Sequence, residues 1–337
     1  MSQRCMSQTI STLLFAAFLL SAGPAAASPW TLPADELTLT MDQVFSYASN
    51  EYLSDGYYQE FPLDGSFRSQ TMTLGARYGF TDRFEGAMQF NVSHVTYSAD
   101  PLILEEFDEA PTGGEATDSI LNFNSSQFGA ADLFLSARYN LHEGPVMVTS
   151  ATTAKLPTGY EEPAPTFTTG PDGEQRVGGQ ATLGDAQSDL MQSLLVGTVV
   201  QPTGTFVRAE LGGRYRFGAP GHQAFADVRA GQHIGDSLIF IAGVTGNMTL
   251  MQGEVIGETL IARDASVPAA QFDEDNIRSE DLRLDRNNLD GVAGLLLALG
   301  DIELTANYYY TFWGRNTAAT HAFTVGTIFS LPDVTGR

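Results

Sequence analysis

The chain has 337 residues, and its 40 Asp and Glu residues outnumber its 17 Lys and Arg residues to give a formal net charge of -23. A surface this acidic repels nucleic acid phosphates, which excludes nucleic acid as a partner. The hydrophobic fraction of 43% and the aromatic fraction of 10% are too high for an intrinsically disordered chain.

The first predicted element is a cleaved secretory signal peptide over residues 1–27. Arg4 gives it a short basic start, Leu13–Leu20 is an apolar run, and Ala25–Ala27 are small residues before the expected cleavage point at Ser28. The apolar run is shorter than a membrane-spanning helix. The alternative interpretation is an N-terminal anchor helix.

The remainder, residues 28–337, is predicted to form one domain. Cys5 is the only cysteine and precedes the expected cleavage point, so the exported chain would hold no disulfide and no cysteine metal site. After Ser28 no segment has the unbroken apolar length of a transmembrane helix, so any membrane span must consist of β-strands.

Alternating runs of about ten to thirteen residues recur along this domain, which is the length that a tilted strand needs to cross a bilayer. Their number, about twelve, is even, as in closed bacterial barrels. The sequence therefore predicts an all-β, closed, antiparallel, up-and-down transmembrane barrel. The predicted strands are 37–49, 68–80, 84–97, 128–140, 146–158, 189–201, 205–217, 224–235, 238–250, 288–299, 302–312 and 319–331.

The links between these strands alternate between tight turns and longer loops. Tight turns rich in Gly, Pro, Asp and Ser occupy 81–83, 142–145, 202–204, 235–237 and 300–301, and the other links are 50–67, 98–127, 159–188, 218–223, 251–287 and 313–318. A barrel with both termini in the periplasm has short turns there and long loops outside. A soluble β-sandwich, the alternative fold, has no reason to sort its loops in this way.

Strand parity assigns the two faces of the sheet. Burying an arginine in hydrocarbon costs about 2–4 kcal/mol near the midplane, so the charged face is predicted to line the lumen. Aromatic residues at strand ends fit membrane-interface girdles, namely Tyr78, Phe80, Phe84, Tyr139, Tyr215, Phe217 and Phe312. The predicted lumen residues are Asp42, Arg77, Glu85, Asp132, Arg138, Lys155, Arg208, Glu210, Arg214, Arg216, Asp227, Arg229 and Glu303.

Several segments resemble one family of Gram-negative outer-membrane barrels, grouped as transporters of the meta pathway of phenol degradation. Phe128–Tyr139 resembles its "FGxxDLxLxARY" strand, and Arg77–Glu85 is similar to its "YGxTDRxE" hairpin. Lys155–Gly159, Leu183–Asp185 and Ser188–Leu190 resemble its "KLPTG … GD … DL" spacing. The resemblance implies a porin-like fold and a location in the cell outer membrane.

The last predicted strand resembles the signal that the barrel-assembly machinery reads on its client proteins. The signal is a polar residue, a glycine and two apolar residues, here Thr324, Gly326, Phe329 and Leu331. The chain departs from the usual form because it continues past the strand and does not end on an aromatic residue. The assembly machinery is therefore an expected partner, and the outer-membrane location adds outer-membrane lipid and lipopolysaccharide.

Two interpretations of the interior stay open. Rows of arginine and carboxylate could set a transverse field across a narrow pore, which would select small polar or anionic solutes. Alternatively, they could pair with each other and fill a small barrel. The first predicts a porin-like channel or uptake component for small aromatic or anionic molecules, and the second a structural or adhesive barrel that acts through its acidic loops.

Other site chemistry has weaker support. Asp273, Asp275, Asp285 and Asp290 are weak calcium candidates, because their loop lacks EF-hand spacing and a solvated acidic loop explains them as well. His233 is the only histidine predicted to face inward, and no nucleophile accompanies it. The sequence therefore predicts no enzymatic activity and no cofactor.

Overall fold

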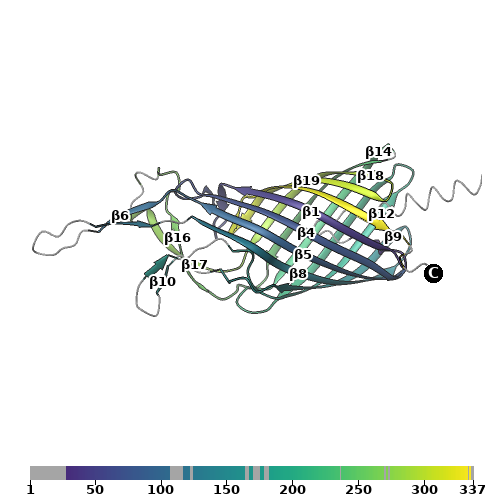
Figure 1. Ribbon diagram of the computed structural model, residues 1–337, viewed down its shortest axis with the longest axis horizontal. Coiled ribbons are helices and arrows are strands. Elements are labelled where there is room, and N and C mark those ends of the chain that lie inside the picture. Colours follow the sequence, from purple (N-terminus) through teal and green to yellow (C-terminus); the bar gives the residue numbers. More distant parts are fainter. Residues whose placement is uncertain are drawn as a thin grey trace, which may run out of the picture.

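Twelve long antiparallel strands form a closed barrel in the computed structural model (Figure 1). The structure describes residues 28–106, 117–121, 124–163, 167–169, 175–177, 182–235, 237–268, 271, 274–332 and 334. The predicted signal peptide lies outside the described residues. Among them, no helix combines the length and the apolar character that crossing a membrane requires.

The barrel closes because its first strand, β1, pairs with the next barrel strand, β4, and also with the last, β21. Both pairings are antiparallel. Around the ring the order is β1-β21-β19-β18-β15-β14-β13-β12-β9-β8-β5-β4. This confirms the predicted barrel and places each predicted strand within a few residues. The barrel strands are β1 (Leu37–Ala48), β4 (Ser66–Thr81), β5 (Phe84–Ser98), β8 (Ser125–His142), β9 (Val146–Pro157), β12 (Asp189–Val200), β13 (Thr205–Arg216), β14 (Gln223–Ile234), β15 (Leu238–Thr249), β18 (Asn287–Leu299), β19 (Ile302–Arg315) and β21 (His321–Leu331).

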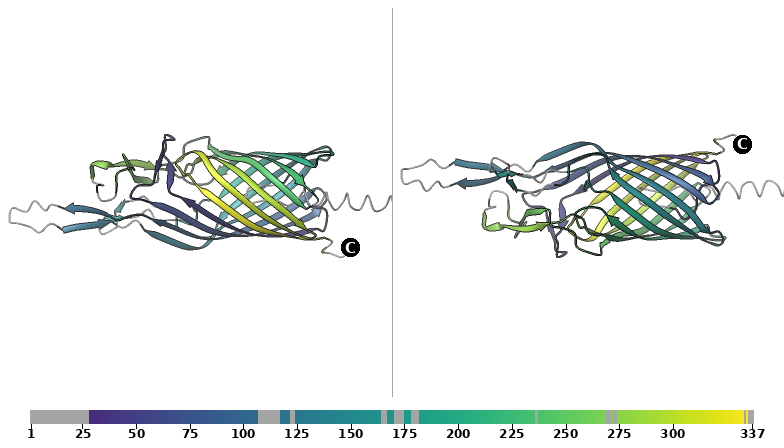
Figure 2. Two further views of the ribbon diagram at one scale, coloured as in Figure 1. Left: turned by 90° about the horizontal axis from the view of Figure 1, so that it is seen from above. Right: turned by 90° about the horizontal axis from the view of Figure 1, so that it is seen from below.

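The short turns and the long loops lie at opposite ends of the barrel, as predicted. Gly204, Gly235 and Gly300 have positive φ angles of 67°, 67° and 70° in the tight turns, which glycine adopts without steric cost. Hairpins from the long loops project at the other end (Figure 2). They contain β2 (Asn50–Tyr52), β3 (Tyr58–Glu60), β6 (Leu102–Glu106), β7 (Thr117–Leu121), β10 (Phe167–Thr169), β11 (Gln175–Val177), β16 (Gly257–Ala262), η2 (Glu274–Asn276), β17 (Ile277–Leu282) and β20 (Thr317–Ala318).

The outside of the barrel is apolar, and the inside carries the charges. Leu211, Met41 and Leu194 are exposed on the outer face. Their neighbours in sequence point the other way, and Glu210, Asp42 and Ser193 are buried. Side chains alternate along a strand, so this confirms the predicted assignment of faces.

Candidate functional site

The barrel interior brings together the predicted lumen residues. Arg214 and Asp132 are partly buried there, and every other predicted lumen residue is buried. Their low exposure shows that side chains and chain segments fill much of the lumen. The buried group comprises Asp42, Arg77, Glu85, Arg138, Lys155, Arg208, Glu210, Arg216, Asp227, Arg229 and Glu303.

Glu85 on β5 anchors a charged triad near the short-turn end. Its two carboxylate oxygens accept bonds from Arg77 Nε at 2.8 Å and Arg77 Nη2 at 2.7 Å, and Arg138 Nη1 donates to Oε1 at 3.1 Å. Glu85 is completely buried, and both arginine side chains are about nine-tenths buried. A bidentate pair of this kind is strong and geometrically specific, so the triad fixes β4, β5 and β8 relative to one another.

A second charged group covers β13 and β14 in the middle of the barrel. The strand register places Arg208 opposite Arg229 and Glu210 opposite Asp227, so like charges face each other across the ladder. Asp227 Oδ2 accepts from Arg229 Nε at 3.0 Å, and the Arg229 guanidinium lies 5.9 Å from the centroid of the Tyr309 ring. Like charges directly opposite destabilise a sheet, so pairing alone does not explain this arrangement.

The third group lies at the long-loop end and joins a loop to the wall. Asp185, in the loop before β12, forms ion pairs with Lys155 and Arg216. Asp189 also contacts both cations, with Oδ2 3.5 Å from Lys155 Nζ and Oδ1 3.4 Å from Arg216 Nε. The adjacent Tyr160 hydroxyl donates to Asp132 Oδ1 at 2.6 Å. These contacts hold residues 182–188 against the barrel mouth.

A second loop is tied to the same mouth. Arg216 Nη1 donates to the carbonyl oxygen of Leu284 at 3.1 Å, and Gln223 Nε2 donates to that of Arg286 at 3.1 Å. Asp285 accepts from the backbone N–H groups of Gly221 at 2.7 Å and Gly253 at 2.6 Å. Arg216 therefore links both loops, and we call Lys155, Asp185, Asp189 and Arg216 the mouth cluster.

The mouth cluster should depend on pH through Asp185. Burial raises the pKa of this carboxyl, but Lys155 and Arg216 outweigh that effect and hold it below the ordinary value of 3.8. Because the folded pKa is lowered, the contacts are complete above pH 3.8 and are lost as the pH falls through the lower folded value. We expect acidification below about pH 4 to lower the protection of residues 182–188 against hydrogen exchange, relative to the intrinsic exchange rate at each pH. Asp185→Asn should show faster exchange already at pH 7, and equal exchange in both proteins would contradict the prediction.

The wall opposite β13 carries carboxylates without nearby cations. Strands β15, β18, β21 and β1 contain no lysine or arginine, and β19 contains only Arg315, at its long-loop end. Strand β1 lies six strands from β13 in either direction around the ring. Asp42 on β1 and Glu303 on β19 point inward from this wall and are buried. A Cβ atom at Gly326 would lie 1.9 Å from Asp42 Oδ1, so the glycine makes room for that carboxylate. The interior is thus electrostatically polarised across its width.

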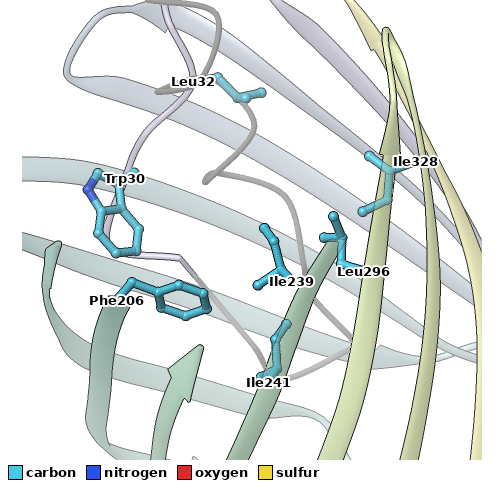
Figure 3. Close-up of a cluster of buried hydrophobic side chains, with 7 residues drawn as sticks. All are labelled: Trp30, Leu32, Phe206, Ile239, Ile241, Leu296 and Ile328. Atoms are coloured by element: carbon cyan, nitrogen blue, oxygen red, sulfur yellow. The ribbon is translucent and has the colours of Figure 1, made fainter. Parts of the chain in front are cut away.

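The segment 28–32, a few residues before β1, lies inside the short-turn end of the barrel (Figure 3). Trp30 is 4% exposed and Leu32 is fully buried. The Trp30 ring packs edge-on against Phe206, with centroids 6.4 Å apart. We call this segment the plug; the apolar wall around it is formed by Phe206, Ile239, Ile241, Leu296 and Ile328.

Hydrogen bonds hold the plug in place. Leu32 N–H donates to Glu85 Oε2 at 3.0 Å, so the charged triad also binds the plug backbone. The carbonyl of Pro29 accepts from Thr149 Oγ1, and Thr31 Oγ1 donates to the carbonyl of Asp82 at 2.8 Å. A Cβ at Gly197 would come within 2.4 Å of Pro29 Cγ, which shows how closely the plug approaches the wall.

Neither the plug nor the role of Asp185 was predicted from the sequence. Trp30 and Leu32 fall between the predicted signal peptide and the first strand, where no periodicity marks them. The sequence did contain a sign of the apolar wall that contacts the plug. Phe206, Ile239 and Ile241 occupy inward-facing positions of their strands, alongside charged or polar residues. From the sequence, Asp185 and Asp189 stood out only as parts of the segments Leu183–Asp185 and Ser188–Leu190, which resemble the family spacing.

The structure does not bring the calcium candidates together. Asp273 lies outside the described residues, and Asp275 is exposed in the loop. Asp285 accepts backbone N–H groups, and Asp290 accepts from Thr311 Oγ1 at 2.6 Å. No group of three or more His, Cys, Asp or Glu side chains within the described ranges could hold a metal ion. The proposed calcium site therefore gains no support.

Comparison with solved structures relates this geometry to known barrels. An outer membrane channel from Pseudomonas putida F1 superimposes with a TM-score of 0.61 at 12% sequence identity, covering 92% of this chain and all of that one. The chain has the fold of an outer-membrane β-barrel. The NanC porin gives a TM-score of 0.44 at 9% identity over 86% of this chain and all of its own. The NalP translocator domain of Neisseria meningitidis gives 0.42 at 13% identity over 97% and 95%.

No family model matches the sequence, and no curated protein matches it. At these identities the likeness establishes the fold alone. The outer-membrane β-barrel fold is thus established, while the function has to be argued from the interior.

Proposed function

We propose that this outer-membrane β-barrel is a passive channel for small molecules, with the path running through the polarised interior. The observation that carries the proposal is the arrangement of arginines and carboxylates inside a wall whose outer face is apolar. A channel of this kind selects solutes through the charges that line it. The resemblance of the chain to barrels grouped with phenol degradation, and the likeness to the Pseudomonas putida channel, support the same function.

Small anionic solutes, including aromatic acids, are the proposed cargo. Arg208 and Arg229 face each other across one ladder, and Arg138 lies on β8, three strands from β13 around the ring. Guanidinium groups recognise carboxylates through paired hydrogen bonds, which a single point charge does not provide. The carboxylates Asp42 and Glu303 on the opposite wall would hold an anion toward the arginine side.

Reversing the charges at the mouth should change ion selectivity. We expect Arg214→Glu combined with Arg216→Glu to shift the reversal potential of the refolded protein in planar bilayers toward cation preference. Arg83, an exposed residue of a short turn that pairs with Glu143 at 2.9 Å, offers the matched control. Arg83→Glu should leave the selectivity unchanged. Equal selectivity of the double variant and the native protein would remove these residues from the conduction path.

A structural or adhesive barrel is the second candidate, and the burial of the lumen favours it. The plug occupies one end, loop residues Asp185 and Leu284 bind the barrel mouth at the other, and Glu85 is completely buried beside its partners. In that case the acidic loops would act instead of the pore. Absence of current steps from both the native protein and a variant without the plug would favour this function over the channel.

A further inference from the structure

A belt of aromatic and basic side chains crosses six strands on the outer face, at the long-loop end of the barrel. One row follows register partners from β19 to β8: Tyr310, His321, Tyr47, Arg68, Thr96 and Ser126. The next row, two residues nearer the short-turn end, consists of Tyr308, Phe323, Phe45, Gln70, His94 and Phe128. We call these two rows the outer belt.

The outer belt marks the edge of the apolar band. Phe128 is 76% exposed, and Phe323, Phe45 and Tyr308 are also exposed. One step farther toward the short turns, the row is Ala306, Val325, Gln43, Met72, Val92 and Ala130, which is almost wholly apolar. Aromatic girdles lie at the boundary between hydrocarbon and headgroups. Because barrel strands are tilted, a register row runs obliquely to the membrane plane, so we assign the headgroup level only to Arg68, its register partner Tyr47 and the adjacent Phe45.

Arg68 is the exceptional member of the belt. On the twelve barrel strands, Arg315, at the last position of β19, is the only other exposed lysine or arginine. The Arg68 guanidinium lies 5.8 Å from the centroid of the Tyr47 ring, and within the described part of the chain no carboxylate pairs with it. A protein of net charge -23 thus keeps a cation on its outer wall with no counter-ion among the described residues.

The strands on either side of Arg68 add further polar groups to the outer belt. The Tyr308 hydroxyl and His321 Nδ1 lie 2.6 Å apart, and His321 packs against Tyr310 with ring centroids 4.7 Å apart. On the other side, His94 Nε2 and Ser126 Oγ lie 3.0 Å apart. The belt is therefore a row of fixed rings and polar groups around one exposed guanidinium.

We propose that Arg68 and the adjacent part of the outer belt bind the phosphate of an acidic lipid of the outer leaflet, the phosphorylated glucosamine of lipopolysaccharide. The inference rests on the proposed placement in the outer membrane. Arginine suits phosphate because its planar guanidinium group donates paired hydrogen bonds to two phosphate oxygens. The aromatic rings at either side cover the apolar part of the lipid next to its headgroup. Such a lipid supplies the negative charge that the described protein residues do not place beside Arg68.

The test is a binding titration of the purified full-length barrel in detergent with diphosphoryl lipid A. A basic residue at a headgroup contributes about 1 kcal/mol, so Arg68→Ala should weaken the dissociation constant about fivefold. Arg83→Ala removes the same charge at the opposite end of the barrel and should leave the affinity unchanged. Arg68→Lys should retain part of the affinity, because the positive charge stays while the paired hydrogen-bond donors of the guanidinium are lost.

Three results would overturn the proposal: no binding of lipid A to the native barrel, equal affinity of the Arg68→Ala variant, or an equal loss in Arg83→Ala. Monophosphoryl lipid A should bind the native protein more weakly and should discriminate less between the native and Arg68→Ala proteins. Planar-bilayer conductance of Arg68→Ala should equal that of the native barrel, since Arg68 lies outside the lumen. A silent native channel with intact lipid A binding would therefore count against the proposed function and not against this site.

Discussion

Replacing Trp30 by alanine should increase the open fraction of the channel. The indole packs among buried side chains inside the barrel, and it holds the plug against Phe206. Its removal takes away about 3 kcal/mol of packing, which corresponds to a shift of about a hundredfold between seated and released plug. The measurement is the frequency and amplitude of current steps in planar bilayers.

Trp313 is the matched control for this experiment. It is the other tryptophan of the chain, and it is 40% exposed at the long-loop end. Trp313→Ala should leave the current steps unchanged. If Trp30→Ala also behaves like the native protein while a deletion of residues 28–33 conducts freely, the plug is held by its hydrogen bonds and not by the indole. No change in either variant would contradict the assignment of this segment as a closure.

Glu85→Gln should be the most destabilising single polar substitution in the interior. It leaves Arg77 and Arg138 buried without their shared counter-charge. Removing one partner of a buried ion pair typically costs about 3–5 kcal/mol. The free energy of unfolding, measured by urea titration in lipid vesicles, should fall by that amount.

Glu143→Gln tests whether the loss comes from burial. Glu143 pairs with Arg83 at 2.9 Å, and both side chains are about half exposed. An exposed pair is worth roughly 0–1 kcal/mol, so this substitution should be close to neutral. A loss of similar size in both variants would show that burial of the triad does not control its strength.

The plug and the triad act on the same closure. Leu32 N–H binds Glu85 Oε2 while Arg77 and Arg138 hold the carboxylate in position. Loss of Glu85 should therefore loosen the plug as well as the wall. A larger rise in current steps for Glu85→Gln than for Glu143→Gln would connect the two features.

The sequence alone determined the barrel and the direction of its faces. Strand parity is local, so Arg208, Glu210 and Arg216 could be placed inside from the alternation between Thr205 and Arg216. The sorting of short and long links likewise follows from turn residues such as Gly204 and Gly300. These features depend on neighbours in the chain, and the structure confirmed them.

Only the tertiary structure decided which inward residues meet. Asp185 and Arg216 are 31 residues apart, and Leu32 and Glu85 are 53 apart, so no local pattern indicates either contact. The plug carries no strand periodicity, and its apolar side chains match a wall assembled from β13, β15, β18 and β21. Closure of the ring is what brings these surfaces together. Local chemistry thus fixed which way each side chain points, and long-range closure fixed what it touches.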